Sequence, residues 1–362
     1  MNILYLNAKK NWGGISTWMQ TTALGLEKKG HKVWIVSHPK ALFTNKADKR
    51  LKIIPKRFGF NYSPFTIFTF VRFIRDKRID LVLTNTEKEV ISGGIAAKTC
   101  GIPNIRRNGN EADFNRKIRV RLHQKFLVNT NIVPCRNIIK QIKEKTPWIN
   151  TNGFVVIYNG KPIQKHSKIQ ISEKKRNWGL KNNDFVIGVI SQLTKDKNND
   201  AVIEIFAKIL TSHPKYKLVI VGEGKYKQEL IDKTKKLEIE KNVCFTGFDD
   251  NPRLAASAFD ISISNSNIEG FPNTVVEYLS VGCATIATNV GGVSEIIKNG
   301  TNGILIEPNN SKMLYDNVIK LIEDKNLRSR LARNALKTVK EKFNESIMVD
   351  EVERVFRIVS KK

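Results

Sequence analysis

The chain has 362 residues, 41% of them hydrophobic and 11 of them proline, which is enough for two globular domains and unlike a disordered protein. No apolar stretch is long enough to span a bilayer, and the four cysteines lack the CxxC spacing of a metal or redox site. The first residues lack the basic start and long apolar core of a signal peptide, so we expect a cytoplasmic protein.

Positive charge is concentrated in the N-terminal half of the chain. The net charge is +28, and residues 1–165 hold 31 Lys and Arg against 9 Asp and Glu, whereas residues 166–362 hold 31 against 25. The two parts therefore carry +22 and +6. Such a basic half is expected to face an anionic partner, which is a phosphate-bearing acceptor, anionic lipid headgroups or nucleic acid.

Short apolar runs alternate with segments of helical period in the N-terminal half. Strands are predicted at 2–6, 32–37, 51–55, 80–84, 103–107, 128–134 and 154–159, and helices at 14–29, 66–77 and 88–99. This alternation is typical of a parallel sheet flanked by helices. The aromatic residues of 58–73 would suit a membrane-facing patch, but aromatic residues at helical spacing favour a place in the core.

Two glycines, Gly13 and Gly14, separate the first predicted strand from the first helix. They permit a tight turn and a close backbone approach to a phosphate or an acceptor, although an ordinary strand-to-helix turn explains them equally well. The loop is not a GxGxxG motif, and GxxxxGK[ST] does not occur, so binding of NAD and P-loop ATP chemistry are disfavoured.

The densest basic run covers residues 106–125. We expect its cations to form a patch for an acceptor or an anionic membrane surface, with a solvated helix as the alternative and nucleic acid as the least favoured partner. The residues predicted for this patch are Arg106, Arg107, Arg116, Lys117, Arg119 and Arg121.

A second α/β series follows a polar, aperiodic stretch at 161–179, which is predicted to be a linker. Strands are predicted at 184–191, 216–222, 242–247, 260–264 and 283–288, and the chain is helical by pattern from 311 onward. Two doubly wound halves would bring the carboxyl ends of both sheets to a central cleft, where this architecture binds ligands. The expected domains are residues 1–162 and 163–345.

The segment 268–297, IEGFPNTVVEYLSVGCATIATNVGGVSEII, places two carboxylates around the start of one predicted helix. Pro272 suits the first turn of that helix, so Glu269 is predicted in the loop and Glu277 inside the helix. A carboxylate can accept hydrogen bonds from both hydroxyls of a diol, so one glutamate would hold a sugar and the other a ribose. The alternative is that Glu269 stabilises the helix dipole and Glu277 is solvated.

The pieces EGFPNTVVE and GCATIATNVGG, followed by Glu295, resemble the E-x7-E signature of glycosyltransferase family 4, the retaining enzymes of bacterial surface-polysaccharide biosynthesis. The resemblance implies the α/β GT-B fold, with two Rossmann-like doubly wound parallel-sheet domains. It also implies that Glu269 and the backbone after it hold the donor sugar and that Glu277 binds the ribose. The backbone positions concerned are Gly270, Phe271, Pro272, Asn273 and Thr274.

Other parts of the chain fit the family less evenly. Relatives usually place an arginine and a lysine on the donor diphosphate; here Lys197 fits, whereas Gln192 departs and offers only neutral hydrogen bonds. Where many relatives have a histidine near the reacting carbon, this chain has Asn108, which cannot act as a titrating base. The resemblance assigns further donor contacts to Gly13, Gly14, Gly222, Glu223 and Phe248, and catalytic roles to Glu269, Lys197 and Asn108.

The expected function is retaining transfer of a sugar from a UDP-sugar to a hydroxyl of a lipid-linked or surface glycan, such as lipopolysaccharide, O-antigen or capsule. The resemblance implies that no divalent metal or other cofactor is needed, and no DxD occurs at a plausible donor loop. We expect a cytoplasmic enzyme at the inner face of the plasma membrane, with helix 346–362 packed on the first domain. The alternatives are a sugar-nucleotide epimerase of the same fold and, less favoured, a nucleic-acid-binding protein.

Overall fold

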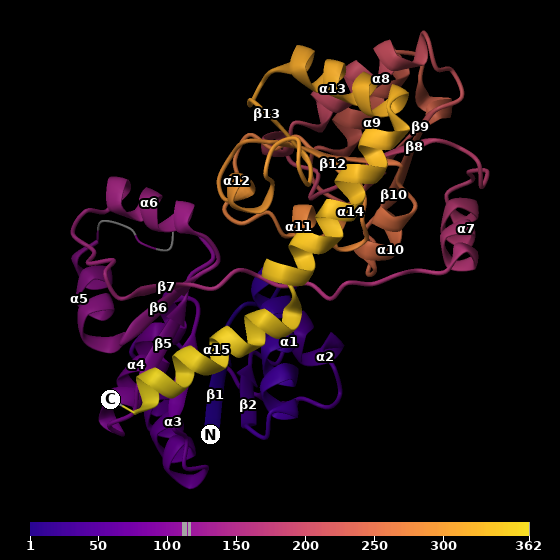
Figure 1. Ribbon diagram of the computed structural model, residues 1–362. Coiled ribbons are helices and arrows are strands. Elements are labelled where there is room, and N and C mark those ends of the chain that lie inside the picture. Colours follow the sequence, from indigo (N-terminus) through magenta and orange to yellow (C-terminus); the bar gives the residue numbers. More distant parts are fainter. Residues whose placement is uncertain (111–113, 115–116, 362) are drawn as a thin grey trace. The chain divides into compact units, whose positions relative to one another are not determined.

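The computed structural model describes residues 1–110, 114 and 117–361, which form two compact units (Figure 1). The N-terminal unit consists of Met1–Asn159 together with Glu345–Lys362, and the C-terminal unit is Gly160–Asn344. The chain therefore leaves the N-terminal unit once and returns to it with its last helix.

Among the described residues of the N-terminal unit, seven parallel strands form one sheet, in the order β3-β2-β1-β4-β5-β6-β7. They are β1 (Asn2–Asn7), β2 (Lys32–Ser37), β3 (Lys52–Pro55), β4 (Leu81–Thr84), β5 (Asn104–Arg107), β6 (Thr130–Val133) and β7 (Phe154–Val156). The chain builds toward one edge from β1 to β3 and toward the other edge from β4 to β7. This is the doubly wound arrangement that the sequence predicts.

Helices cover both faces of this sheet. Successive residues of β1 point to opposite sides, so they pack against different helices. Ile3 and Tyr5 pack with residues of α1 and α15, whereas Leu4 and Leu6 pack with residues of α3 and α4. The helices of the unit are α1 (Gly14–Lys28), α2 (Leu42–Lys46), α3 (Pro64–Asp76), α4 (Glu87–Thr99), α5 (Ile118–Leu127), α6 (Arg136–Lys145) and α15 (Glu345–Ser360).

Six parallel strands form the sheet of the C-terminal unit, in the order β10-β9-β8-β11-β12-β13. They are β8 (Val186–Ile190), β9 (Lys217–Val221), β10 (Val243–Gly247), β11 (Ile261–Ser264), β12 (Ala284–Thr288) and β13 (Ile304–Ile306). The strand order reverses between β8 and β11, and ligands of open α/β sheets bind beyond the carboxyl ends of strands at such a point.

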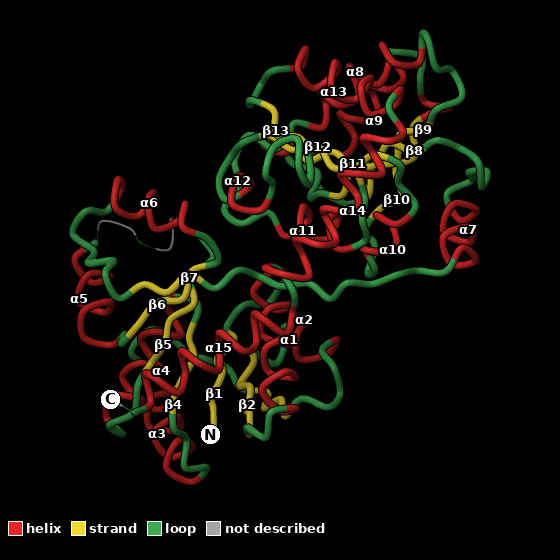
Figure 2. Tube along the Cα trace, viewed as in Figure 1, coloured by secondary structure: helices red, strands yellow, loops and turns green. Residues whose placement is uncertain are grey.

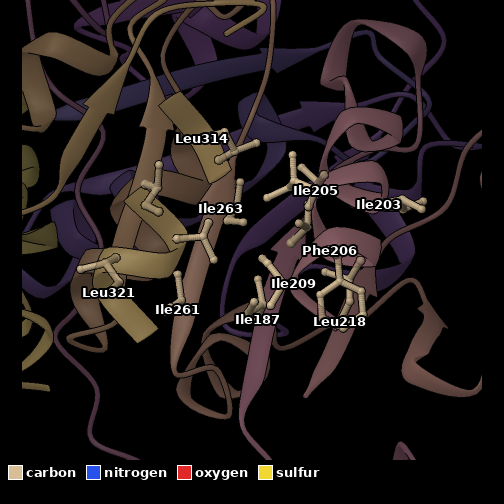
Figure 3. Packing of buried hydrophobic residues seen from close by; sticks show 14 of the residues in the cluster. Ile187, Ile203, Ile205, Phe206, Ile209, Leu218, Ile261, Ile263, Leu314 and Leu321 are labelled. Carbon is tan, nitrogen blue, oxygen red and sulfur yellow. The ribbon is translucent and has the colours of Figure 1, made fainter. Parts of the chain in front are cut away.

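Helices lie on both sides of the strands of the C-terminal unit (Figure 2), and buried hydrophobic residues fill the space between sheet and helices on each side. On one face, Ile187, Leu218 and Ile261 pack against Phe206 and Leu314 (Figure 3). On the other face, α10 and α11 pack on β8 and β9. The helices are α7 (Lys168–Asn177), α8 (Asn199–Leu210), α9 (Lys227–Lys236), α10 (Pro252–Ser257), α11 (Asn273–Ser280), α12 (Val293–Ile296), α13 (Ser311–Glu323) and α14 (Lys325–Lys342), with 3₁₀ turns η2 (Lys195–Lys197) and η3 (Glu240–Asn242).

The prediction of an irregular linker at 161–179 is wrong in its second half, where α7 forms. A capping box begins this helix: the Gln170 amide nitrogen donates to Ser167 Oγ at 3.2 Å, and the Ser167 amide donates to Gln170 Oε1 at 2.9 Å. Lys175 is its one buried residue, so α7 has no apolar stripe to reveal it in the sequence. Among the residues that the structure describes, no helix is long and apolar enough to cross a membrane.

Helix α15 is fastened to the N-terminal unit by a cluster of charges around Glu353. The Glu353 carboxylate lies 2.7 Å from Lys29 Nζ, 3.0 Å from His31 Nε2 and 2.7 Å from an Arg357 guanidinium nitrogen. Hydrogen bonds from Lys29 and His31 lower the pKa of Glu353 from 4.5 to about 2. The ionised carboxylate therefore stabilises the folded N-terminal unit.

Replacing Glu353 by Gln is expected to lower the free energy of unfolding of the N-terminal unit by about 1–2 kcal/mol at neutral pH, because the cations lose a charged partner. Since the folded pKa is depressed, the difference from the wild type is full above pH 4.5 and disappears as the pH falls toward 2. Chemical denaturation across this pH range measures it. Glu351→Gln on the same helix is the control, and an equal effect of both changes would contradict the assignment.

Candidate functional site

Four loops meet at the carboxyl edge of the C-terminal sheet, following β8, β9, β11 and β12. Backbone hydrogen bonds join the first two, from Leu193 N–H to the Glu223 carbonyl at 2.9 Å. Others join the β8 loop to the β11 loop, from Asn267 N–H to the Asp196 carbonyl at 2.8 Å, and the β12 loop to the β11 loop. The loops thus form one continuous edge that carries most of the predicted donor-binding residues.

Lys197 and Glu269, which lie far apart in the sequence, form an ion pair at this edge. Lys197 Nζ lies 2.6 Å from Glu269 Oε1, which also accepts a hydrogen bond from Ser266 Oγ at 2.8 Å. Their side chains are only 19% and 17% exposed, so water screens the pair weakly. Glu269 lies in the loop before α11, as predicted, and Ser266 is a partner that the sequence did not indicate.

Glu277 lies inside α11, as predicted, and forms a second ion pair with Lys161. Lys161 Nζ is 2.6 Å from Glu277 Oε1, and both side chains are largely covered. Sequence reasoning missed Lys161 because no spacing rule links it to Glu277. Its place at the start of the predicted linker, directly after Asn159-Gly160, was the available signal. The site therefore holds two largely covered lysine–glutamate pairs.

Three glycines let these loops approach one another closely. A Cβ on Gly222, whose φ is +142°, would lie 1.8 Å from the Ser191 carbonyl oxygen. A Cβ on Gly224 would lie 2.1 Å from the Leu193 carbonyl oxygen. Gly291 has φ +56°, and its Cβ would lie 2.0 Å from the Glu269 carbonyl oxygen. The Gly291-Gly292 turn thus packs directly on the loop that carries Glu269.

The remaining predicted residues of this edge are more exposed. Glu223 pairs with Lys227 at 2.7 Å, and the Phe248 ring, just after β10, is 69% exposed. Gln192 is an exposed residue of the β8 loop. Because Gln192 carries no charge, the cations that lie beside Glu269 and Glu277 are Lys197 and Lys161. Among the described residues, no group of three or more His, Cys, Asp or Glu side chains could hold a metal ion.

In the N-terminal unit, Asn108 directly follows β5, and its backbone N–H donates to the Ile132 carbonyl at 2.8 Å. Its side chain is 0% exposed, and neither Oδ1 nor Nδ2 has a hydrogen-bond partner among the described residues. Burying an amide without a partner costs roughly 1–3 kcal/mol. A group retained at that cost is a candidate for binding a ligand.

The glycines after β1 do not form the predicted glycine-dependent turn. Gly13 has φ −173°, an extended conformation open to any residue, and Gly14 is the first residue of α1. A Cβ on Gly13 would meet no atom within 4 Å. The backbone of Gly13 therefore does not require glycine, and the space beside its Cα is open.

Two members of the predicted basic patch are buried and cannot face a membrane or an acceptor from the surface. Arg106 is 1% exposed, lies 3.4 Å from Glu87 and stacks on the Phe114 ring. Arg107 lies over the Trp18 ring and donates to Asn159 Oδ1 at 3.2 Å. Arg106 and Arg107 are buried because they belong to β5, a strand whose two faces are covered by helices.

The other predicted patch residues lie on or beside α5. Lys117, Arg119 and Arg121 are exposed there, and Arg116 lies outside the described residues. The surface patch is therefore confined to α5 and the residue before it.

Comparison with known families assigns both units. The family model described as Glycosyltransferase Family 4 matches residues 12–164, and the model described as Glycosyl transferases group 1 matches residues 170–338. The two matches together take up most of the chain. The fold is that of GT-B glycosyltransferases, and the chain belongs to the glycosyltransferase family that these two models describe.

Two curated relatives match most of the chain. Over 248 residues the chain is 27% identical to N-acetyl-alpha-D-glucosaminyl L-malate synthase of Bacillus anthracis, covering 68% of this chain and 64% of that protein. Over 304 residues it is 24% identical to UDP-Gal:alpha-D-GlcNAc-diphosphoundecaprenol alpha-1,3-galactosyltransferase of Escherichia coli, covering 80% and 78%. The chain thus spans about two thirds of the first relative and more of the second.

A crystal structure of Anabaena HepE in complex with UDP superposes on this chain with a TM-score of 0.85. The match covers 99% of this chain and 100% of that protein, at 21% sequence identity. At this identity the likeness establishes the GT-B fold.

Gly291→Ala is expected to destabilise the C-terminal unit by about 3 kcal/mol or more and to displace the Glu269 loop, because it combines a positive φ with a backbone clash. Gly300→Ala is the matched control: its φ is +70°, but its Cβ would meet nothing within 4 Å, so it should cost only about 1 kcal/mol. Urea unfolding compares the two variants. Equal losses would show that Gly291 serves its own turn and not the Glu269 loop.

Proposed function

We propose that this glycosyltransferase moves a sugar from a UDP-sugar to a hydroxyl of a lipid-linked or surface glycan, with retention of configuration at the sugar carbon. The observation that carries the proposal is the pair of lysine–glutamate contacts, Lys197–Glu269 and Lys161–Glu277, at the start of α11 and within it. Carboxylates suit sugar and ribose hydroxyls, and ammonium groups suit a diphosphate.

In each pair the glutamate binds hydroxyl groups of the donor and the lysine binds its diphosphate. The Glu277 carboxylate accepts hydrogen bonds from the two ribose hydroxyls, and Glu269 accepts from hydroxyls of the transferred sugar. Lys197, released from Glu269, and Lys161, released from Glu277, turn toward the diphosphate. Two ammonium groups then neutralise charge on the leaving UDP, which offsets the neutral Gln192 without a metal ion.

The bond from the sugar carbon to the phosphate oxygen breaks, and a bond from that carbon to the acceptor oxygen forms on the same face. The acceptor proton passes to the departing phosphate oxygen, so the step uses no side-chain base. Asn108 fits this scheme as a hydrogen-bonding group for a sugar hydroxyl, since its buried amide has both a donor and an acceptor to offer.

Two observations support a lipid-linked acceptor. The E. coli relative is named for a sugar linked to undecaprenyl diphosphate, and the cations of α5 are exposed. These cations would hold the enzyme at the anionic inner face of the plasma membrane. The B. anthracis relative is named for a small acceptor, L-malate, which makes a soluble acceptor the second candidate. Lipopolysaccharide, O-antigen and capsule intermediates belong to the first class.

Thermal shift with UDP-, GDP- and ADP-sugars tests the donor, and acceptor-dependent release of UDP tests the transfer. Glu277→Gln is expected to weaken UDP binding at least about tenfold by calorimetry, because a neutral amide replaces the ribose-binding carboxylate. Glu323→Gln, on α13, is the control and should bind as the wild type does. Unchanged affinity of the Glu277 variant would refute the ribose role, and epimerised donor formed without acceptor would indicate an epimerase.

Asn108→Leu separates a structural role of this residue from a functional one. Leucine has a similar volume and removes a buried amide that has no partner among the described residues, so the free energy of unfolding should stay the same or rise by about 1 kcal/mol. Transfer should fall at least about a hundredfold, since the sugar loses a hydrogen-bonding group. Urea unfolding and single-turnover kinetics measure the two effects. A destabilised but fully active variant would assign Asn108 to the core.

A further inference from the structure

Exposed hydrophobic side chains are concentrated in two short segments of the N-terminal unit. Of the thirteen large hydrophobic residues that are exposed in the described part of the chain, seven lie in 60–68 and 118–126. They are Phe60, Tyr62, Phe65, Phe68, Ile118, Leu122 and Phe126. Clusters of this kind on a soluble surface mark interaction sites, whereas single exposed apolar residues do not.

Helix α3 contributes an outer aromatic face that is distinct from its core face. Phe65 and Phe68 are 77% and 66% exposed, and Phe60 in the preceding loop is 71% exposed. The core face of the same helix uses other residues, Phe70 and Ile74, which pack with β1. The sequence favoured a core role for the whole aromatic segment, and the structure shows that this prediction is wrong for its outer half.

Helix α5 contributes a stripe at helical spacing. Ile118, Leu122 and Phe126 follow one another at intervals of four residues and are all exposed, whereas Val120 and His123 on the opposite side are buried. Exposed cations flank the stripe, namely Lys117, Arg119, Arg121 and Lys125.

A chain of hydrogen bonds joins the two segments into one face. The Tyr62 hydroxyl lies 2.5 Å from His123 Nε2, and His123 Nδ1 bonds to the carboxylate of Glu87, the first residue of α4. Helix α4 also contacts both α3 and α5, and the three helices lie together in Figure 1. The exposed residues of 60–68 and 118–126 are called the α3–α5 face below.

The charge around the α3–α5 face is almost entirely positive. Residues 56–78 and 117–126 hold ten Lys and Arg and one acidic residue, Asp76. Three lysines lie directly over its rings: Lys56 is 5.6 Å from the Phe65 centroid, and Lys98 and Lys125 are each 5.3 Å from the Phe126 centroid. Long cationic side chains beside aromatic rings are typical of helices that lie in a membrane interface, with the charges in the headgroup layer.

We propose that the α3–α5 face inserts its phenylalanine and aliphatic side chains into the headgroup and acyl boundary of an anionic lipid bilayer. The inference rests on the membrane association proposed above and changes its mode, from attraction by basic residues alone to insertion anchored by those residues. A second copy of the chain is a poor occupant, because two such faces would bring like charges together. Anionic headgroups complement the cations, and the acyl boundary covers the exposed rings.

Flotation with vesicles of phosphatidylcholine and phosphatidylglycerol tests insertion, with pure phosphatidylcholine vesicles for comparison. The double variant Phe65→Ser/Phe68→Ser and the variant Leu122→Ser should each bind the anionic vesicles at least about tenfold more weakly than the wild type. Their unfolding midpoints should match that of the wild type, because these side chains are exposed. Ile358→Ser, which removes an exposed hydrophobic residue from α15 of the same unit, should bind normally.

Salt separates insertion from simple electrostatic attraction. At high salt the wild type and Arg119→Gln/Arg121→Gln should keep a similar bound fraction, because both retain the apolar side chains, whereas the phenylalanine variant should be released completely. Loss of all wild-type binding at high salt would overturn insertion and leave attraction by the cations. A concentration-dependent dimer in the ultracentrifuge that the phenylalanine variant abolishes would also overturn it, in favour of self-association.

The outcome can be told apart from failure of the proposed enzyme function. The Phe65→Ser/Phe68→Ser, Leu122→Ser and Ile358→Ser variants should give the same thermal shift with UDP-sugars and the same rate with a short, water-soluble acceptor, since none of these residues is a predicted donor-site or acceptor-patch residue. If wild-type protein fails with UDP-sugars but floats with anionic vesicles, the donor proposal fails and insertion stands. If the phenylalanine variant floats as the wild type does, insertion fails and the donor proposal stands.

Discussion

The ion pair between Lys197 and Glu269 is the contact on which the C-terminal site depends. Lys197 comes from the turn after β8 and Glu269 from the loop after β11, and these strands are neighbours only because the strand order reverses there. A sheet wound in one direction would leave the two loops apart. Glycines at 222, 224 and 291 then allow loop backbones to approach to distances that a Cβ would forbid. The strand order thus places Lys197 near Glu269, and the glycines allow the loops that carry them to pack closely.

How far the sequence predicts this protein depends on how local each signal is. The loop and helix around Glu269 and Glu277 could be predicted because turn, proline and helix start lie within ten residues. Lys161 and His123 could not, since each meets its partners across the fold, and no periodicity encodes such a meeting. Helix α7 was missed for a different reason, as a polar helix held by a capping box shows no apolar stripe.

The cations of the N-terminal unit fall into two groups, buried and exposed, which a count of charges cannot distinguish. Arg106 and Arg107 are structural cations: they lie inside the fold against Glu87, Phe114 and Trp18, where their planar groups stack on rings. Arg119 and Arg121 on α5 are solvent-facing and flank the apolar stripe. A count of +22 for the first half therefore overstates the charge that the surface presents, and the position of each cation on strand or helix decides its role.

Under the proposed function, the Lys197–Glu269 and Lys161–Glu277 pairs also explain how a strongly charged site stays folded before a donor binds. A largely covered carboxylate without a counter-ion would be costly, and a lysine at 2.6 Å offsets that cost. A nucleotide-sugar can replace both interactions at once, with hydroxyls for the carboxylates and phosphates for the ammonium groups. Binding then exchanges one set of charge-assisted hydrogen bonds for another and leaves few charges unpaired. On this view the lysines hold the glutamates ready before the donor arrives and stabilise the diphosphate after it binds.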